Sequence, residues 1–329
     1  MRMISDGRLH LQDGPIDLIV FAEGRRGAVE CAYEAAAKRF ATVLDELCKE
    51  LPGLRARALP GKSSLSGSVA RRMKRAVSPF AAEVFITPMA AVAGAVAEEV
   101  LGVMVESAPL LRAYVNNGGD IALHLQAGET FTIGLIDRPD RASLFGTAAL
   151  TANDGVRGIA TSGWRGRSFS LGIADAVTVL ARTAAEADAA ASLIANAVNL
   201  PGHEAISRVP ARDLQADSDL GSLLVTQGVG RLSAAEIASA LERGAACALD
   251  LINRNLIRAA ALHLQGVTKL VCGKGEEYPL QSKILPLEFT HLALNQFSHC
   301  VHCSSHGGEG QGEGGLNKAF RNVENWTSR

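Results

Sequence analysis

The chain has 329 residues, 47% of them hydrophobic and 20% charged, a balance typical of a globular protein with a sizeable buried core. A net charge of −1 excludes a strong electrostatic attraction to nucleic acid or to an anionic membrane, and an aromatic content of 5% leaves few rings for stacking bases. We therefore expect neither nucleic acid nor a membrane as a partner.

The start of the chain and its most apolar window both favour a cytoplasmic protein. Residues 1–10 have no apolar core behind a basic start, which argues against a signal peptide. Residues 85–105 carry Glu98 and Glu99 near the centre of their helical part, which argues against a membrane span. Thiols stay reduced in the cytoplasm. Three of the six cysteines lie in helical patterns: Cys31, Cys48 and Cys247.

The N-terminal part predicts a hairpin followed by a long helix. Residues 9–22 alternate apolar and polar side chains around an Asp-Gly-Pro turn, which is typical of a hairpin. Residues 24–51 repeat apolar side chains at the spacing of one helix face, and Pro52 is expected to end that helix. Residues 53–79 are rich in Lys and Arg and are expected to form a solvated loop.

An alanine-rich helix over 88–107 precedes a series of short strands. The predicted strands are 113–116, 121–125, 130–136, 143–151, 157–162 and 177–181. Two capping boxes, at Thr183 and Ser233, open helices that are expected to run to 198 and to about 264. Because no regular βαβ rhythm is present, we expect the α+β class, with mixed or antiparallel sheets and packed helices. The alanine-rich helices are compatible with a homodimer interface.

The composition changes after Gly266, where alanine nearly disappears. We expect a main domain over 1–272 and a C-terminal extension over 273–329 that is partly disordered, because its Gly/Glu run cannot pack a core. The extension contains Cys300 and Cys303 with three histidines nearby. One Cys-x-x-Cys pair is an incomplete set for structural zinc, so adventitious metal binding competes with a dedicated site.

The sequence Asn-Asn-Gly-Gly-Asp at 116–120 lies between two predicted strands. Paired glycines allow positive φ and a close approach to a ligand, and exposed N–H groups there can bind anions. The same sequence also reads as a plain hairpin turn, since Asn-Gly is a strong hairpin signal. Thr161 and Ser162 end another strand, where they either hydrogen-bond a ligand or only turn the chain.

Three further side chains are candidates for metal or acid–base chemistry. Asp188 and Ser192 stand four residues apart on one predicted helix face, an arrangement that can ligate Mg²⁺. The alternative is that Asp188 complements the helix dipole while Ser192 is a small packing residue. Asp175 follows an apolar run and precedes a strand, so its charge needs a partner such as a metal, a donor or water.

Several of these segments occur in an order that resembles the ApbE flavin-transferase superfamily. The matching segments are residues 86–98 (family pattern "idlGgiaKGyavD"), 115–139 ("alvnlGGdi…w.vgi.dP"), 160–163 ("ATSG") and 177–192 ("svTV…ADalaT"). The resemblance covers residues 86–198 and implies an ApbE-like α+β fold. Proteins of that family bind FAD beside Mg²⁺ and transfer FMN to a threonine of a target protein.

Carried over residue by residue, the resemblance implies a Mg²⁺ site at Asp188 and Ser192, with Ser192 in place of the usual threonine. It also implies that a flavin (FAD or FMN) or another nucleotide is bound by two groups of residues. These are Asn116, Asn117, Gly118, Gly119 and Asp120, and nearby Thr161 and Ser162.

The sequence also departs from the family pattern. The family's lysine position is Ala93, its aspartate is Glu98, and residues 168–175 replace its "HiiDPrTG" segment. The chain is more similar to an uncharacterised, soluble side branch that carries "PMAAVAGAVA", "NNGGDI" and "GIADAVTV". Flavin transfer therefore lacks a lysine and a histidine that matching members have.

Three hypotheses follow. The first is an ApbE-like protein that binds a flavin, a nucleotide or another small anionic ligand with Mg²⁺ and does not transfer FMN; Asp175 and Asp188 are its candidate acid–base or metal groups, and Asp175 is the predicted catalytic residue. The second is a cytoplasmic FMN transferase that uses altered residues. The third is a binding protein without catalysis.

Overall fold

The computed structural model describes residues 1–4, 6–61, 64–136, 144–273 and 280–281. Within these residues, helices and antiparallel sheets combine as the α+β prediction requires. The Cys/His-rich stretch with Cys300 and Cys303 and the predicted Gly/Glu run lie outside the described residues.

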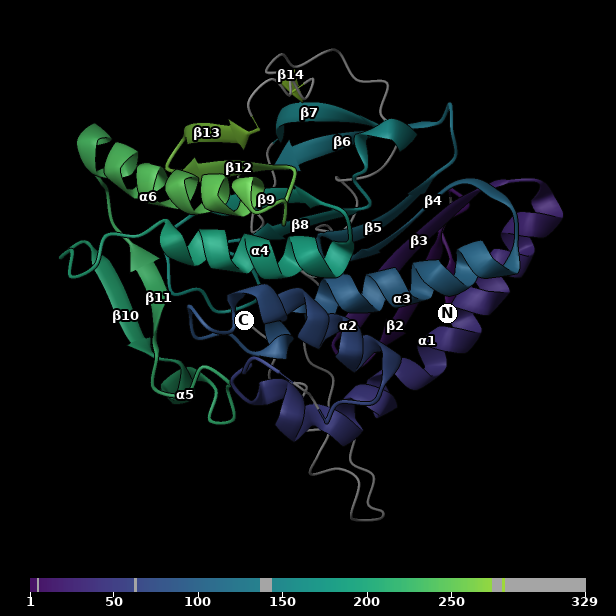
Figure 1. Cartoon of the computed structure of the whole chain (residues 1–329), viewed down its shortest axis with the longest axis horizontal. Helices are drawn as coiled ribbons and strands as arrows, with labels where there is room; N and C mark the ends of the chain where they lie inside the picture. The colour runs from purple at the N-terminus through teal and green to yellow at the C-terminus, as the bar shows by residue number, and fades with distance from the viewer. Residues whose placement is uncertain (5, 62–63, 137–143, 274–279, 282–329) are drawn as a thin grey trace, which may run out of the picture.

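A nine-stranded antiparallel sheet forms the centre of the molecule (Figure 1). In spatial order its strands are β1 (Arg2–Met3), β2 (Leu9–Asp13), β3 (Ile16–Gly24), β4 (Leu110–Asn117), β5 (Asp120–Leu125), β8 (Gly158–Ser162), β9 (Ala176–Ala181), β12 (Ala259–Leu264) and β13 (Val267–Cys272). A three-stranded sheet contains β14 (Leu280–Gln281), β7 (Leu144–Thr151) and β6 (Thr130–Ile136). A two-stranded sheet pairs β10 (Ile206–Pro210) with β11 (Leu224–Val229).

Helices cover one face of the large sheet, and β6 and β7 lie toward its other face (Figure 1). The α-helices are α1 (Arg26–Arg55), α2 (Ser68–Val77), α3 (Val92–Ser107), α4 (Ala184–Ala197), α5 (Ala211–Leu214) and α6 (Ala234–Asn253). The 3₁₀ turns are η1 (Ser78–Phe80), η2 (Pro88–Ala91) and η3 (Ala152–Asp154). The central helix α4 packs on β8, β9, α3 and α6.

Strand β3 shows how the sequence produces these layers. Its buried residues Ile16, Leu18 and Val20 alternate with Ile19 and Phe21. Successive side chains of a strand point to opposite faces, so the first set packs against the helices. The second set packs against the core that β6 and β7 share with the large sheet. The hairpin predicted for residues 9–22 is confirmed by the β2–β3 pairing.

The helix predicted over 88–107 is confirmed as η2 followed by α3. Among the described residues it is the one helical stretch long and apolar enough to cross a membrane by length and composition. It packs against α1, α4, β4 and β5. Its buried Glu99 accepts hydrogen bonds from Arg39 Nε at 3.0 Å and Arg72 Nε at 2.9 Å. The stretch is therefore a core helix whose carboxylate has two guanidinium partners.

Two predictions about the N-terminal helices are wrong. Helix α1 continues through Pro52 to Arg55, because burial of Leu54 outweighs the single backbone hydrogen bond that the proline removes. The cation-rich stretch predicted as a loop contains α2. Its residues Val69 and Met73 are buried at helical spacing, and its cations occupy the remaining face.

The helix after Ser233 is also shorter than predicted. Both directions of its capping box form, and the helix ends at Asn253 rather than near 264. Asn255 then takes a left-handed conformation with φ 57°. Residues 259–261 are alanines, good helix formers, yet they lie in β12, hydrogen-bonded between β9 and β13. Tertiary pairing has overridden local propensity there.

Candidate functional site

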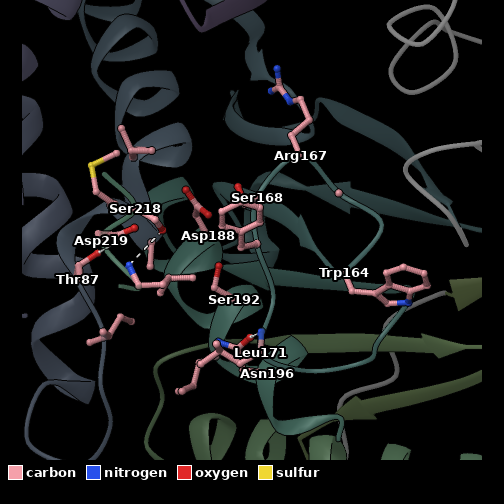
Figure 2. A pocket seen from close by; sticks show the side chains of 18 of the residues that line it. Thr87, Trp164, Arg167, Ser168, Leu171, Asp188, Ser192, Asn196, Ser218 and Asp219 are labelled. Carbon is pink, nitrogen blue, oxygen red and sulfur yellow. Dashed lines mark hydrogen bonds between the residues drawn. The ribbon is translucent and has the colours of Figure 1, made fainter. Parts of the chain in front are cut away.

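A cavity of about 490 Å³ opens beside α4 (Figure 2). Its walls come from η2 and the start of α3, from α4, from the loop 163–175 between β8 and β9, and from the segment 211–223 between β10 and β11. Sequence-distant segments thus meet at one polar hollow. Figure 2 shows Thr87, Ser218 and Asp219 on one side of it, and Trp164 and Arg167 on the other.

The Asn-Asn-Gly-Gly-Asp sequence is a hairpin turn, and it also supplies a side chain to the cavity. Asn117 pairs with Asp120 across the turn, and Gly118 and Gly119 have φ of 66° and 111°. The Asn116 Oδ1 accepts from the Gly119 N–H at 2.8 Å, which fixes the turn. Asp120 therefore starts β5 with its side chain at the cavity wall. The hairpin-turn interpretation is confirmed, and binding of a ligand by the paired glycines stays a prediction.

The adjoining residue Asn117 holds the hairpin against α3. Its Nδ2 donates to the Ala93 carbonyl at 3.1 Å. Asn117 lines a smaller, mostly apolar recess of about 100 Å³ that shares Ala93 and Arg167 with the main cavity. Asn116, Gly118 and Gly119 are not among the residues that line either space.

Helix α4 brings Asp188 and Ser192 to the cavity on one face, as their spacing predicted. Thr183 caps the helix by accepting from the Glu186 N–H at 3.2 Å. The Gly94 N–H of α3 donates to Asp188 Oδ2 at 3.0 Å. A Cβ on Gly94 would lie 2.2 Å from the Ala184 carbonyl oxygen, so only glycine permits this approach of the two helices.

The two carboxylates of this wall are buried without a cationic partner at ion-pair distance among the described residues. Burial raises the pKa of Asp188 to about 7, although backbone N–H groups of Gly94 and Ala93 oppose the shift. Burial, and then the negative charge of Asp188, raises the pKa of Asp120 well above its usual range. Within the described part of the chain, neither carboxylate has a Lys or Arg partner at ion-pair distance. Such a pair needs protons or a cation.

The donors of this wall fit a Mg²⁺ ion. Two carboxylates and the Ser192 hydroxyl are hard oxygen ligands, and Mg²⁺ prefers such oxygens together with water and phosphate. A divalent cation would also offset the like charges of Asp120 and Asp188, which the protein leaves unpaired.

A cation that the sequence analysis missed lies beside the hairpin turn. Arg167 lines both the cavity and the apolar recess. A Cβ on Gly118 would lie 1.7 Å from the Arg167 Nη2, so the guanidinium rests where residue 118 has no side chain. Its charge lowers the pKa of Asp120, against the larger effect of burial. Among the described residues Arg167 forms no ion pair, and it is exposed.

The segment 211–223 adds residues that no local sequence signal marked. Thr87 Oγ1 donates a hydrogen bond to Asp219 Oδ2, across 132 positions of sequence. Arg55 Nη1 lies 2.9 Å from Asp217 Oδ2. These two contacts hold the segment against the end of α1 and the start of η2, so Asp219 and Ser218 form part of the wall.

The structure does not bring Asp175 to the cavity wall. Its carboxylate is buried and accepts from Trp164 Nε1 at 3.1 Å, Arg165 Nε at 2.7 Å and the Gln265 N–H at 2.7 Å. These contacts place the Trp164 ring, which does line the cavity. The geometry thus gives Asp175 a positioning task, and its catalytic role stays a prediction.

Thr161 and Ser162 lie behind the wall rather than in it. The Thr161 N–H donates to Asp120 Oδ1 at 3.2 Å, and its hydroxyl pairs with the Thr178 hydroxyl at 2.9 Å. Thr161 therefore orients Asp120. The contact with a ligand predicted for Thr161 and Ser162 stays a prediction.

Comparisons with known proteins identify relatives of the chain. A family model described as "AbpE bacteria" matches residues 1–270. A UPF0280 protein of Methanopyrus kandleri is 35% identical over 183 residues, which are 55% of this chain and 69% of that protein. A UPF0280 protein of Methanothermobacter thermautotrophicus is 41% identical over 118 residues, which are 35% of this chain and 44% of that protein. The chain thus spans less than half of the second relative.

Solved structures with a similar arrangement of the chain include the ApbE protein of Thermotoga maritima and the flavinyl transferase ApbE of Pseudomonas stutzeri in its apo form. The first has a TM-score of 0.44 and 13% identity over 80% of this chain and 96% of that one. The second has a TM-score of 0.44 and 15% identity over 80% of this chain and 93% of that one. Because the family model covers residues 1–270, the chain belongs to the AbpE bacteria family, which confirms the resemblance that its motifs indicated.

Proposed function

We propose that this protein binds a phosphorylated flavin or nucleotide together with Mg²⁺ in the cavity beside α4. The observation that carries the proposal is the convergence of Asp120, Asp188 and Ser192 on one wall. The pKa values of both carboxylates are raised there. Binding of a divalent cation would therefore release protons and relieve the repulsion between the two ionised groups.

Each residue of the wall has a defined task in this proposal. Asp120 and Asp188 would bind the ion. Their carboxylates accept hydrogen bonds from the N–H groups of Thr161 and Gly94, respectively. Such outer contacts orient metal ligands and are commonly needed for affinity. Ser192 would supply a neutral oxygen. When bound, the ion would draw the oxygens of a phosphate group to this wall.

Arg167 supports a phosphate rather than a neutral ligand. Its guanidinium has no anionic partner at ion-pair distance among the described residues, and it borders the same cavity. Guanidinium groups bind phosphate through two parallel hydrogen bonds. The apolar recess next to Arg167 could take an apolar edge of the ligand, since its walls include Leu44 and Leu47.

Binding, rather than FMN transfer, is the activity we propose. Ala93 stands at the start of α3 where the sequence resemblance implies a lysine, so that position cannot donate or accept a proton. The carboxylate of Asp175 is already occupied by three donors. FMN transfer remains the second candidate, because the family resemblance implies it, and the experiment below separates the two.

Titration calorimetry with FMN and FAD, in the presence of Mg²⁺ or of EDTA, tests the proposal. We expect binding that needs Mg²⁺ and that falls at least about tenfold in Asp188→Asn and in Asp120→Asn. Asp213→Asn, an exposed carboxylate on α5, is the matched control and should bind as the wild type does. Flavin binding of equal strength in EDTA would contradict the metal site.

The same preparation tests transfer. The protein is incubated with FAD, Mg²⁺ and a threonine-containing target peptide, and the peptide mass is measured. We expect no covalent FMN. A modified peptide whose formation is lost in Asp188→Ala would instead establish the transferase.

A further inference from the structure

The cavity has a second wall whose chemistry differs from that of the carboxylate pair. We infer that Asp219 on this wall is a specificity-determining residue that accepts a hydrogen bond from a ring N–H of the ligand's heterocycle. The inference rests on the proposed function, because it concerns the same cavity. It narrows the ligand to phosphorylated compounds whose ring carries an N–H next to a carbonyl, as the flavin and guanine rings do.

Asp219 is held in place before any ligand arrives. Thr87 Oγ1 donates to its Oδ2, and the neighbouring Asp217 is paired with Arg55 at 2.9 Å. The two anchors come from different parts of the chain, the residue before η2 and the end of α1. A side chain fixed in this way loses little freedom when it binds a donor, which favours recognition.

The polar groups around Asp219 differ from those around the carboxylate pair. Asp120, Asp188 and Arg167 line the part of the cavity that we assign to the metal and phosphate. Asp219 lies among neutral hydrogen-bonding groups of the segment 211–223 and of β11, and the cation Arg55, which also lines the cavity, is paired with Asp217. The neutral groups are Gln215, Ser218, Thr226 and Gln227. A ligand with a charged end and a neutral polar ring would match this division.

Asp219 can accept more than the bond from Thr87. A carboxylate offers about four lone-pair positions. Burial raises the pKa of Asp219, although the Thr87 hydroxyl opposes the shift, so the ionised group gains from a further donor. No Arg or Lys lies at ion-pair distance from it within the described residues; Arg55 is paired with Asp217.

The face of α4 that lines the cavity also provides a donor for a ligand carbonyl. The Asn196 Oδ1 accepts from the Leu171 N–H at 2.8 Å, which fixes the orientation of the amide. Its NH₂ group then remains as a donor at the cavity. Asp219 offers an acceptor and Asn196 a donor to a ligand in this cavity, the two kinds of partner that a ring N–H and a carbonyl require. An adenine ring has no ring N–H to give.

Ligand pairs that differ by one methyl group test the inference. We would measure the affinity, in Mg²⁺, of FMN against N3-methyl-FMN and of GDP against 1-methyl-GDP, with ADP as the ring that lacks the N–H. The wild type should bind at least one unmethylated ligand about tenfold to a hundredfold more tightly than its methylated partner. The two pairs distinguish a flavin from a guanine ligand.

Variants then assign the discrimination to Asp219. In Asp219→Ala the unmethylated ligand and its methylated partner should bind with about equal affinity, and binding should still depend on Mg²⁺. Thr87→Val keeps the Asp219 carboxylate but removes the hydroxyl that holds it. Its affinity ratio between unmethylated and methylated ligand should therefore lie between those of the wild type and Asp219→Ala. Asp213→Ala, on the same segment and exposed, should keep the wild-type ratio. Thermal melts of each variant confirm that it is folded.

Several outcomes overturn the inference. Equal affinity within both pairs in the wild type, or a ratio that survives in Asp219→Ala, shows that Asp219 does not read the ring. An equal loss for methylated and unmethylated ligands in Asp219→Ala assigns it to another group, such as a sugar hydroxyl. If these results occur while binding still requires Mg²⁺ and Asp188, only this inference fails. If binding of every ligand is absent or independent of Mg²⁺, the proposed function fails with it.

Discussion

The N–H of Gly94 donates to the carboxylate of Asp188 at 3.0 Å, at the place where α3 and α4 approach too closely for any Cβ. Gly94 therefore links the packing of two core helices to the orientation of a side chain in the cavity. The same backbone contact that stabilises the fold positions the proposed metal ligand.

The first prediction concerns this close approach. In Gly94→Ala the new Cβ would meet the Ala184 carbonyl oxygen at 2.2 Å, so the helices must separate. We expect a loss of about 1–3 kcal/mol in the free energy of unfolding, measured with urea, and weaker Mg²⁺ binding. Gly102→Ala on the same helix is the control, since its Cβ would lie 4.0 Å from the nearest atom, Arg72 Nη2. Equal stability of the two variants would contradict the prediction.

The second prediction concerns pH in the metal-free protein. Asp188 has a folded pKa of about 7, above its ordinary value of 3.8, so the folded state holds this proton more tightly than the unfolded chain. The resulting stabilisation is complete below about pH 4 and is lost as the pH rises through about 7. In EDTA, Asp188→Asn should melt higher than the wild type at pH 8, and the difference should shrink toward pH 5.

With added Mg²⁺, the wild type should melt at a higher temperature than Asp188→Asn. At pH 8 the ion should raise the melting temperature of the wild type and leave Asp188→Asn unchanged, because only the carboxylate gains a partner. A variant that is less stable than the wild type at pH 8 in EDTA would show that hydrogen bonds from the protein already satisfy Asp188.

The third prediction concerns the seat of Arg167. Gly118 has φ 66°, and a Cβ there would displace the Arg167 guanidinium. Gly118→Ala should therefore weaken Mg²⁺-dependent FMN binding, measured by calorimetry, and add backbone strain of about 1–2 kcal/mol. Gly155→Ala has nearly the same φ of 63°, and its Cβ would lie at an ordinary 3.6 Å from Arg258 Nη2. Gly155→Ala therefore reports the effect of backbone strain without displacement of a neighbouring side chain. An equal effect of both variants on FMN affinity would count against the assignment of Arg167.

The parts of the fold that the sequence predicted are those with a local signal. Strand β6 has the predicted bounds 130–136 because its side chains alternate between core and surface. Helix α2 was missed although Val69 and Met73 carry the helical period, because the many cations between them favoured a loop. Strand β12 was merged into a helix because its alanines show no period, and pairing with β9 decides its structure.

The residues of the candidate site also differ in whether a local sequence signal marks them. Asp120, Asp188 and Ser192 could be predicted because each lies in a short motif, and the structure brings all three to one cavity. Asp219 could not, since the bond that places it joins positions 132 residues apart. Arg167 has no motif in this chain either, and its position follows from the missing side chain of Gly118.

The last prediction concerns the carboxylate inside the helix layer. Burial would raise the pKa of Glu99, but hydrogen bonds from Ser68, Arg72 and Arg39 outweigh it and lower the pKa. The stabilisation is therefore present above about pH 4.5 and declines as the pH falls further. Glu99→Gln removes one of the two carboxylates on each guanidinium, because Arg39 keeps Glu46 and Arg72 keeps Glu98. We therefore expect a loss of about 1.5–3 kcal/mol in urea unfolding at pH 7, the range for hydrogen bonds to charged groups.

Glu106→Gln, an exposed position on the same helix, provides the comparison and should change the free energy of unfolding by less than about 0.5 kcal/mol. The difference between the two variants should narrow as the pH falls below about 4.5, because the wild-type carboxylate then loses its charge. A difference that does not depend on pH would mean that Glu99 acts through its shape and its packing between α1, α2 and α3, and that its charge contributes nothing to the stability of this core.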